Sequence, residues 1–111
     1  MADFDEKKVL KDMLSASQSK AGAVWDKAKD DIEEEFKILA SVGARIVARK
    51  AAGTITEVNA KFLIAQYFGA ARSFLYSLEG IANIILESII NAALEVLREA
   101  IKVATGGWVV I

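Results

Sequence analysis

The chain has 111 residues, of which 54% are hydrophobic and 26% charged, and its formal net charge is −1. This length predicts one domain over residues 1–111, and the near-neutral charge argues against a general nucleic-acid-binding protein. The chain contains no cysteine and no histidine. It therefore lacks disulfides, thiolate nucleophiles, zinc–thiolate sites, the base of the usual hydrolytic triads and the Glu-x-x-His motif of di-iron bundles.

The first predicted helix covers residues from about 4 to 18. Its apolar residues Val9, Leu10, Met13 and Leu14 recur at helical spacing among charged residues, which indicates an amphipathic helix. Alternating serines and a glycine in residues 15–22 lower helix propensity, so we expect a break or a bend there, the alternative being a helix that continues through. The first residues lack the apolar segment of a signal peptide, which predicts a location in the cytoplasm or in an assembled particle.

The second predicted helix is long and covers residues from about 21 to 52. An apolar stripe runs along it at helical spacing, formed by Ala21, Trp25, Ala28, Ile32, Phe36, Leu39, Gly43 and Ile46. Gly53 suits the left-handed conformation that ends helices, and Thr54 with Glu57 forms a capping-box pattern for the next helix. No proline interrupts any of the predicted helices.

Charge is distributed unevenly along this second helix. Acidic residues come first, namely Asp30, Asp31, Glu33, Glu34 and Glu35. Basic residues follow at Arg45, Arg49 and Lys50. We interpret the acidic run as a solvated helix face and the basic cluster as charge that complements the helix dipole, with contact to phosphate or anionic lipid as a minor alternative.

Two further helices are predicted over residues from about 55 to 78 and from about 81 to 104. They are separated only by Glu79 and Gly80, so the alternative is one helix of about 50 residues, because a single glycine is tolerated inside a helix. A turn at Gly80 brings oppositely charged residues level with each other, which favours an antiparallel hairpin. The predicted pairs are Arg72 with Glu87, Lys61 with Glu99, and Glu57 with Lys102.

Charged residues are rare between Phe62 and Leu97, where only Arg72, Glu79, Glu87 and Glu95 occur. This segment is therefore predicted to be buried on more than one side. Its longest uncharged stretch, residues 62–71, is too short for a membrane span, which needs about 20 residues. After Gly106 and Gly107, an apolar tail over residues 108–111 is expected either to fold back on the bundle or to dock on a neighbouring subunit.

Two rows of small residues at four-residue spacing would let helix backbones approach closely. One row is Ala40, Ala44, Ala48 and Ala52, and the other is Ala65, Gly69, Ser73 and Ser77. Either row is compatible with packing inside the bundle or with a subunit interface.

These features predict an all-α protein, an elongated bundle of three to four amphipathic helices. The second helix alone would be about 50 Å long, whereas a compact globule of this length is only about 35 Å across. A rod buries less of its own apolar surface, so we expect a non-enzymatic structural protein that self-associates through apolar helix faces as a coiled-coil-like homo-oligomer, for example in a virion or phage particle. The predicted interface consists of Phe62, Phe68, Phe74, Ile85, Ile89, Trp108, Val109, Val110 and Ile111.

No catalytic, cofactor-binding or metal-binding residues are predicted. Two alternative functions remain from the sequence. One is a membrane-active, holin-like or pore-forming hairpin in which Arg72 and Glu87 pair inside the bilayer. The other is a small regulator or inhibitor that binds one heterologous protein through the tail or an exposed apolar face.

Overall fold

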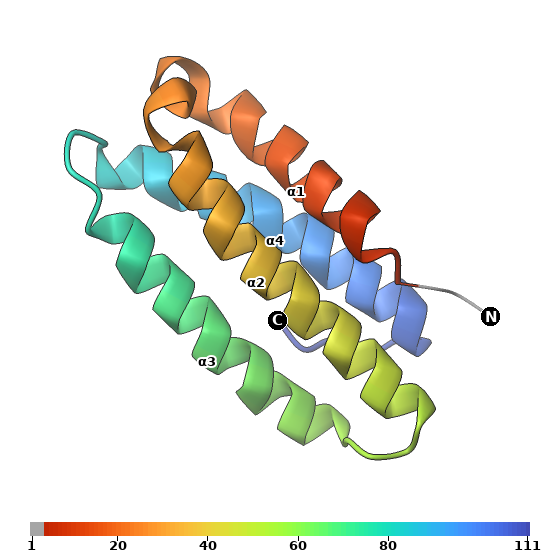
Figure 1. The fold of residues 1–111 in the computed structure, drawn as a ribbon. Coiled ribbons are helices and arrows are strands. Elements are labelled where there is room, and N and C mark those ends of the chain that lie inside the picture. The colour runs from red at the N-terminus through yellow and green to blue at the C-terminus, as the bar shows by residue number, and fades with distance from the viewer. Residues whose placement is uncertain (1–3) are drawn as a thin grey trace.

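The computed structural model describes residues 4–111, and in this part of the chain four α-helices follow one another in an up-and-down arrangement (Figure 1). Helix α1 spans Glu6–Ala21, α2 spans Trp25–Ala51, α3 spans Glu57–Tyr76 and α4 spans Asn83–Thr105. A short 3-10 turn, η1, covers Gly22–Val24. The molecule measures 44 × 23 × 18 Å, and residues 4–111 contain no strand, so the predicted elongated all-α bundle is confirmed.

The break predicted within residues 15–22 lies at the end of that segment, at Gly22. The serines stay inside α1: the Ser17 hydroxyl is buried and donates to the Ile89 carbonyl at 3.1 Å, and the Ser19 hydroxyl donates to the Ala16 carbonyl at 2.8 Å. With these hydroxyls satisfied, α1 continues to Ala21 and ends at Gly22. The chain then reverses, so that α1 and α2 lie side by side and antiparallel (Figure 1).

The chain also reverses at Gly80, so the alternative of one continuous helix is wrong. Helix α3 ends at Tyr76, Gly80 has a φ of +81°, and α4 begins at Asn83. A positive φ strains residues that have a Cβ atom, and glycine adopts it readily. The hairpin predicted near Gly80 is therefore confirmed, as Figure 1 shows.

The cap of α3 differs from the predicted capping box. Thr56 has extended backbone angles, and its hydroxyl oxygen accepts from the Asn59 N–H at 3.1 Å. The Thr54 hydroxyl instead donates to the Arg49 carbonyl at 3.2 Å, which helps to close the end of α2. Because residues 52–55 are needed to turn the chain, α3 begins two residues later than the Thr54–Glu57 pattern predicts.

Replacing this cap gives a local prediction for stability. Thr56→Ala is expected to lower the free energy of unfolding by about 1 kcal/mol, because one N–H of the first turn of α3 loses its acceptor. Chemical denaturation followed by circular dichroism measures this difference. The matched variant Thr54→Ala is expected to cost less, and a larger loss for Thr54 than for Thr56 would contradict the assignment of the cap.

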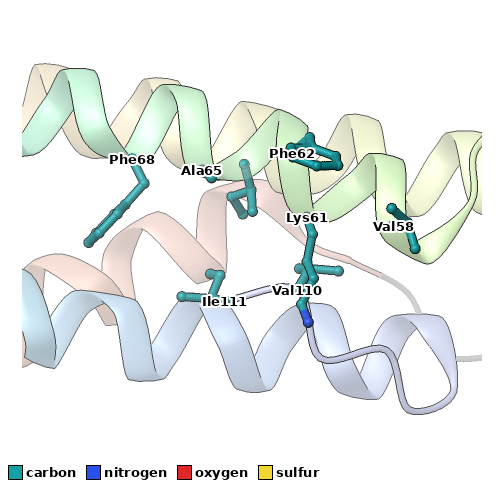
Figure 2. Close-up of a pocket in the computed structure, with 8 residues that line it drawn as sticks. Val58, Lys61, Phe62, Ala65, Phe68, Val110 and Ile111 are labelled. Carbon is teal, nitrogen blue, oxygen red and sulfur yellow. The ribbon is translucent and has the colours of Figure 1, made fainter.

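The hydrophobic core lies where α1, α2 and α4 meet, and α3 packs along one side of α2 (Figure 1). Its largest fully buried side chains are Phe36, Met13, Ile32, Leu39, Ile46, Ile64, Leu75, Leu86, Ile89, Leu97, Ile101 and Val42. Near the turn, α3 and α4 share contacts around Phe68, Leu75 and Ile90. Farther from the turn, the C-terminal tail lies between α3 and α4 (Figure 2). This arrangement leaves the outer side of α3 uncovered.

Candidate functional site

An open apolar groove runs along α3, beside the C-terminal tail (Figure 2). It has a volume of about 510 Å³ and is lined by Val58, Lys61, Phe62, Ile64, Ala65, Phe68, Val110 and Ile111. Each α3 residue of this lining has another three or four positions away, so these residues share one face of the helix. Lys61 is the only charged residue among them. A groove with this lining can hold apolar groups.

The tail forms one wall of the groove. Thr105 is buried, and its hydroxyl donates to the Ile101 carbonyl at 2.6 Å and accepts from the Trp108 N–H at 3.1 Å. Val110 is only 3% exposed. The Val109 N–H donates to the Glu57 carboxylate at 3.3 Å. The Lys50 ammonium lies 5.4 Å from the centre of the Trp108 ring, within the range of cation–π attraction. The tail thus folds back on the bundle of its own chain.

The predicted interface residues fall into three groups. Phe62 and Phe74 are exposed, at 69% and 41%. Partly buried are Phe68, Ile85, Trp108, Val109 and Ile111.

Ile89 and Val110 belong to the core, which corrects their assignment to a surface. Ile89 lies on the side of α4 that packs against α1, as the hydrogen bond from Ser17 to its carbonyl shows, and Val110 is covered because the tail folds back.

Several exposed apolar residues are not among those predicted from the sequence. Val58 is 61% exposed, Ile84 is 77% exposed, Val103 is 58% exposed and Ile38 is 42% exposed. The spacing of Val58, Phe62 and Ala65 is a signal that could have identified the groove, since it defines one apolar face of α3.

Of the three predicted charge pairs between α3 and α4, the structure forms one. The Arg72 guanidinium lies 2.9 Å from both carboxylate oxygens of Glu87 and donates to the Tyr76 hydroxyl at 3.2 Å. Within residues 4–111, no ion pair joins Lys61 to Glu99 or Glu57 to Lys102, so those two predictions are wrong. The tail lies between the helices at that end, and Glu57 binds the backbone N–H of Val109 instead.

The small-residue rows differ in their surroundings. Ala40 is buried in the core and Ala44 is partly buried, whereas Ala48 and Ala52 are exposed. The other row, Ala65, Gly69, Ser73 and Ser77, is exposed throughout. The row on α3 therefore lies at the surface, close to the groove.

The charged side of α2 is only partly solvated. Asp30 and Glu34 are exposed, but Asp31, Glu33 and Glu35 are half-buried. Burial raises the pKa of Glu35, and the neighbouring carboxylates of Glu34 and Asp31 raise it further. Like charges are thus crowded on this half of the helix. Toward the other end, Arg45 and Arg49 are exposed and Lys50 lies at the Trp108 ring.

A smaller groove of about 330 Å³ lies where α2 meets α3. It is lined by Lys37, Ile38, Ser41, Val42, Arg45 and Tyr67. Four of these residues, Lys37, Ile38, Ser41 and Arg45, are themselves exposed. The groove therefore opens onto the outer face of α2.

Among residues 4–111, no group of three or more acidic side chains is arranged to hold a metal ion. None of the helices in the described part of the chain is long and apolar enough to cross a bilayer. Comparison with known proteins found no matching family, no matching curated protein and no matching solved structure.

Proposed function

We propose that this chain is a non-enzymatic structural subunit that assembles with copies of itself through the outer face of α3. The observation that carries the proposal is the exposure of Phe62 and Val58, at 69% and 61%, beside a groove lined almost entirely by apolar side chains. Large aromatic residues next to a pocket are typical anchors of protein interfaces.

Energetics favour several anchors acting together. Full burial of one Phe or Val side chain contributes about 1.5–3 kcal/mol, whereas association costs at least about 4 kcal/mol in lost rigid-body freedom. Phe62 alone therefore does not hold two copies together. The contact buries enough apolar surface to offset this cost when Phe62, Val58 and the groove of both copies take part. The exposed row of small residues that includes Ala65 and Gly69 lets a second backbone come close.

Size-exclusion chromatography with light scattering, over a series of protein concentrations, tests the proposal. The wild-type chain is expected to form a defined oligomer. Phe62→Asp is expected to weaken its association by about tenfold or more, because a carboxylate would enter the apolar contact.

Ile84→Asp is the matched control, since Ile84 is equally apolar, is 77% exposed and lies on α4 outside the groove. It should assemble like the wild type. A wild-type chain that stays monomeric at every concentration would contradict self-association. Equal association of the wild type and the Phe62 variant would contradict the role of the α3 face.

A further inference from the structure

Six of the exposed residues on the outer face of α2 form a symmetric series, and Lys27 and Lys37 are also exposed on this face. Asp30, Glu34, Ile38, Ser41, Arg45 and Arg49 are all exposed, and they follow one another at intervals of four, four, three, four and four residues. Such intervals place side chains along one face of a helix. Read from either end, the spacing is the same, while the charge changes from acidic at Asp30 and Glu34 to basic at Arg45 and Arg49.

These charges have no oppositely charged partner within the described chain. The three ion pairs formed by residues 4–111 are Lys8–Asp12, Arg72–Glu87 and Glu95–Arg98, and none includes a residue of α2. Arg49 donates only to the Thr54 carbonyl, at 3.1 Å. Two acidic and two basic side chains on one helix face thus remain unmatched.

We infer that this face binds the same face of a second copy, with the two α2 helices antiparallel about a two-fold axis between Leu39 and Ala40. This inference rests on the proposed function and specifies one contact of the assembly. In this register Glu34 lies level with Arg45 of the partner subunit, and Asp30 lies level with Arg49 of the partner subunit. The two-fold symmetry forms each pair twice. A parallel arrangement in register would place like charges level and is therefore disfavoured.

The centre of this contact is self-complementary. Ile38 is 42% exposed and is one of the residues that line the 330 Å³ groove, together with Lys37, Ser41, Val42, Arg45 and Tyr67. The two-fold axis brings Ile38 level with Ser41 of the partner subunit, so each isoleucine meets the groove of the other copy. A patch that contacts its own copy in this way makes an isologous interface.

Ile38 and the charged residues have different effects on this contact. Exposed ion pairs add little affinity, but they select orientation and register. Ile38 and the groove supply the apolar burial. The α2 face and the α3 groove have no residue in common, so dimers formed through α2 can be linked further through α3. Two separate contacts per chain are what an extended assembly requires.

Charge reversal tests the α2 contact. The experiment uses the Phe62→Asp background, so that the α3 contact is weakened, and measures dimer dissociation by sedimentation velocity. Glu34→Arg and Arg45→Glu, each alone, are expected to weaken the dimer by about tenfold, because each places like charges level twice. The double variant should recover most of the affinity.

An equimolar mixture of the two single variants should also recover the dimer. At positions 34 and 45 one copy then carries two basic residues and the other carries two acidic residues, so both pairs are opposite in charge. Lys11→Glu and Glu79→Arg reverse exposed charges elsewhere and should change nothing. Circular dichroism verifies that every variant folds.

The outcomes separate this inference from the proposed function. Single reversals without effect, or a loss that neither the double variant nor the mixture restores, would overturn the antiparallel α2 contact. If the α2 contact is overturned in this way, a loss of oligomers in the variant that carries Phe62→Asp alone would still support the α3 face. A wild-type chain that is monomeric at all concentrations would overturn both.

Discussion

Phe36→Ala is expected to lower the free energy of unfolding by about 3–5 kcal/mol. Phe36 is 1% exposed, and the space around it is lined by residues of α2, α3 and α4, including Leu39, Phe68, Leu75 and Ile90. The cavity beside it has a volume of only about 10 Å³. Removing the ring therefore loses its transfer free energy and leaves a cavity between three helices that cannot all move inward at once.

Urea or guanidinium denaturation followed by circular dichroism measures this loss. Ile38→Ala is the matched control, because Ile38 lies two residues away on the same helix and is 42% exposed. At a concentration where the protein is monomeric, the control is expected to cost less than about 1 kcal/mol. Equal losses for the two variants would contradict the placement of Phe36 at the junction of α2, α3 and α4.

The core face of α2 could be predicted from the sequence because one helical period determines it. Of the eight residues that the sequence places on one stripe, six are buried in α2, namely Ala28, Ile32, Phe36, Leu39, Gly43 and Ile46. Trp25 is only half-buried, and Ala21 is the last residue of α1. The helix boundaries follow from equally local signals: Gly80 has a positive φ in the turn, and the chain reverses within a few residues of the predicted points. Local chemistry is enough for such features, since neighbouring residues supply all the constraints.

The pairing of α3 with α4 could be predicted only near the turn. Arg72 and Glu87 are close because the chain itself holds them together at Gly80. At the end of the hairpin away from Gly80 the helices are no longer constrained by the turn, and the tail lies between α3 and α4 (Figure 2). Two helices with evenly spaced axes would leave no room between them for a segment that returns from the end of α4. The groove beside Phe62 depends on the same segment and could not be foreseen in full.

Burial on α4 also depends on partners that the sequence pattern does not identify. Ile84 and Ile89 are both isoleucines in the same apolar helix, yet Ile84 is 77% exposed and Ile89 is 0% exposed. Ile89 meets α1, whose Ser17 binds its carbonyl. A helix that is apolar on nearly all sides does not reveal which side its neighbours cover. Which side of α4 is buried is determined by helices that are distant in sequence.

Val110→Asp is expected to lower the free energy of unfolding by about 2–3 kcal/mol, which is the free energy of docking the tail. Val110 is 3% exposed, so a carboxylate in its place would be buried without a partner at a cost of several kcal/mol. The tail follows Gly106 and Gly107 and belongs to no helix. Releasing the tail costs less free energy than burying the carboxylate. The loss in the free energy of unfolding is therefore limited to the free energy of docking the tail.

Deleting residues 108–111 removes the same docked segment and is therefore expected to destabilise the bundle by the same amount as Val110→Asp. Denaturation curves of the two variants should overlap, whereas Val103→Asp, at a residue that is 58% exposed, should remain near the wild type. A loss for Val110→Asp well above that of the deletion would mean that the tail cannot leave its place between α3 and α4. No loss for either variant would mean that the tail adds nothing to the fold. Equal losses would show that the tail is a separately docked element, and that the wall it gives to the α3 groove can be removed without unfolding the helices.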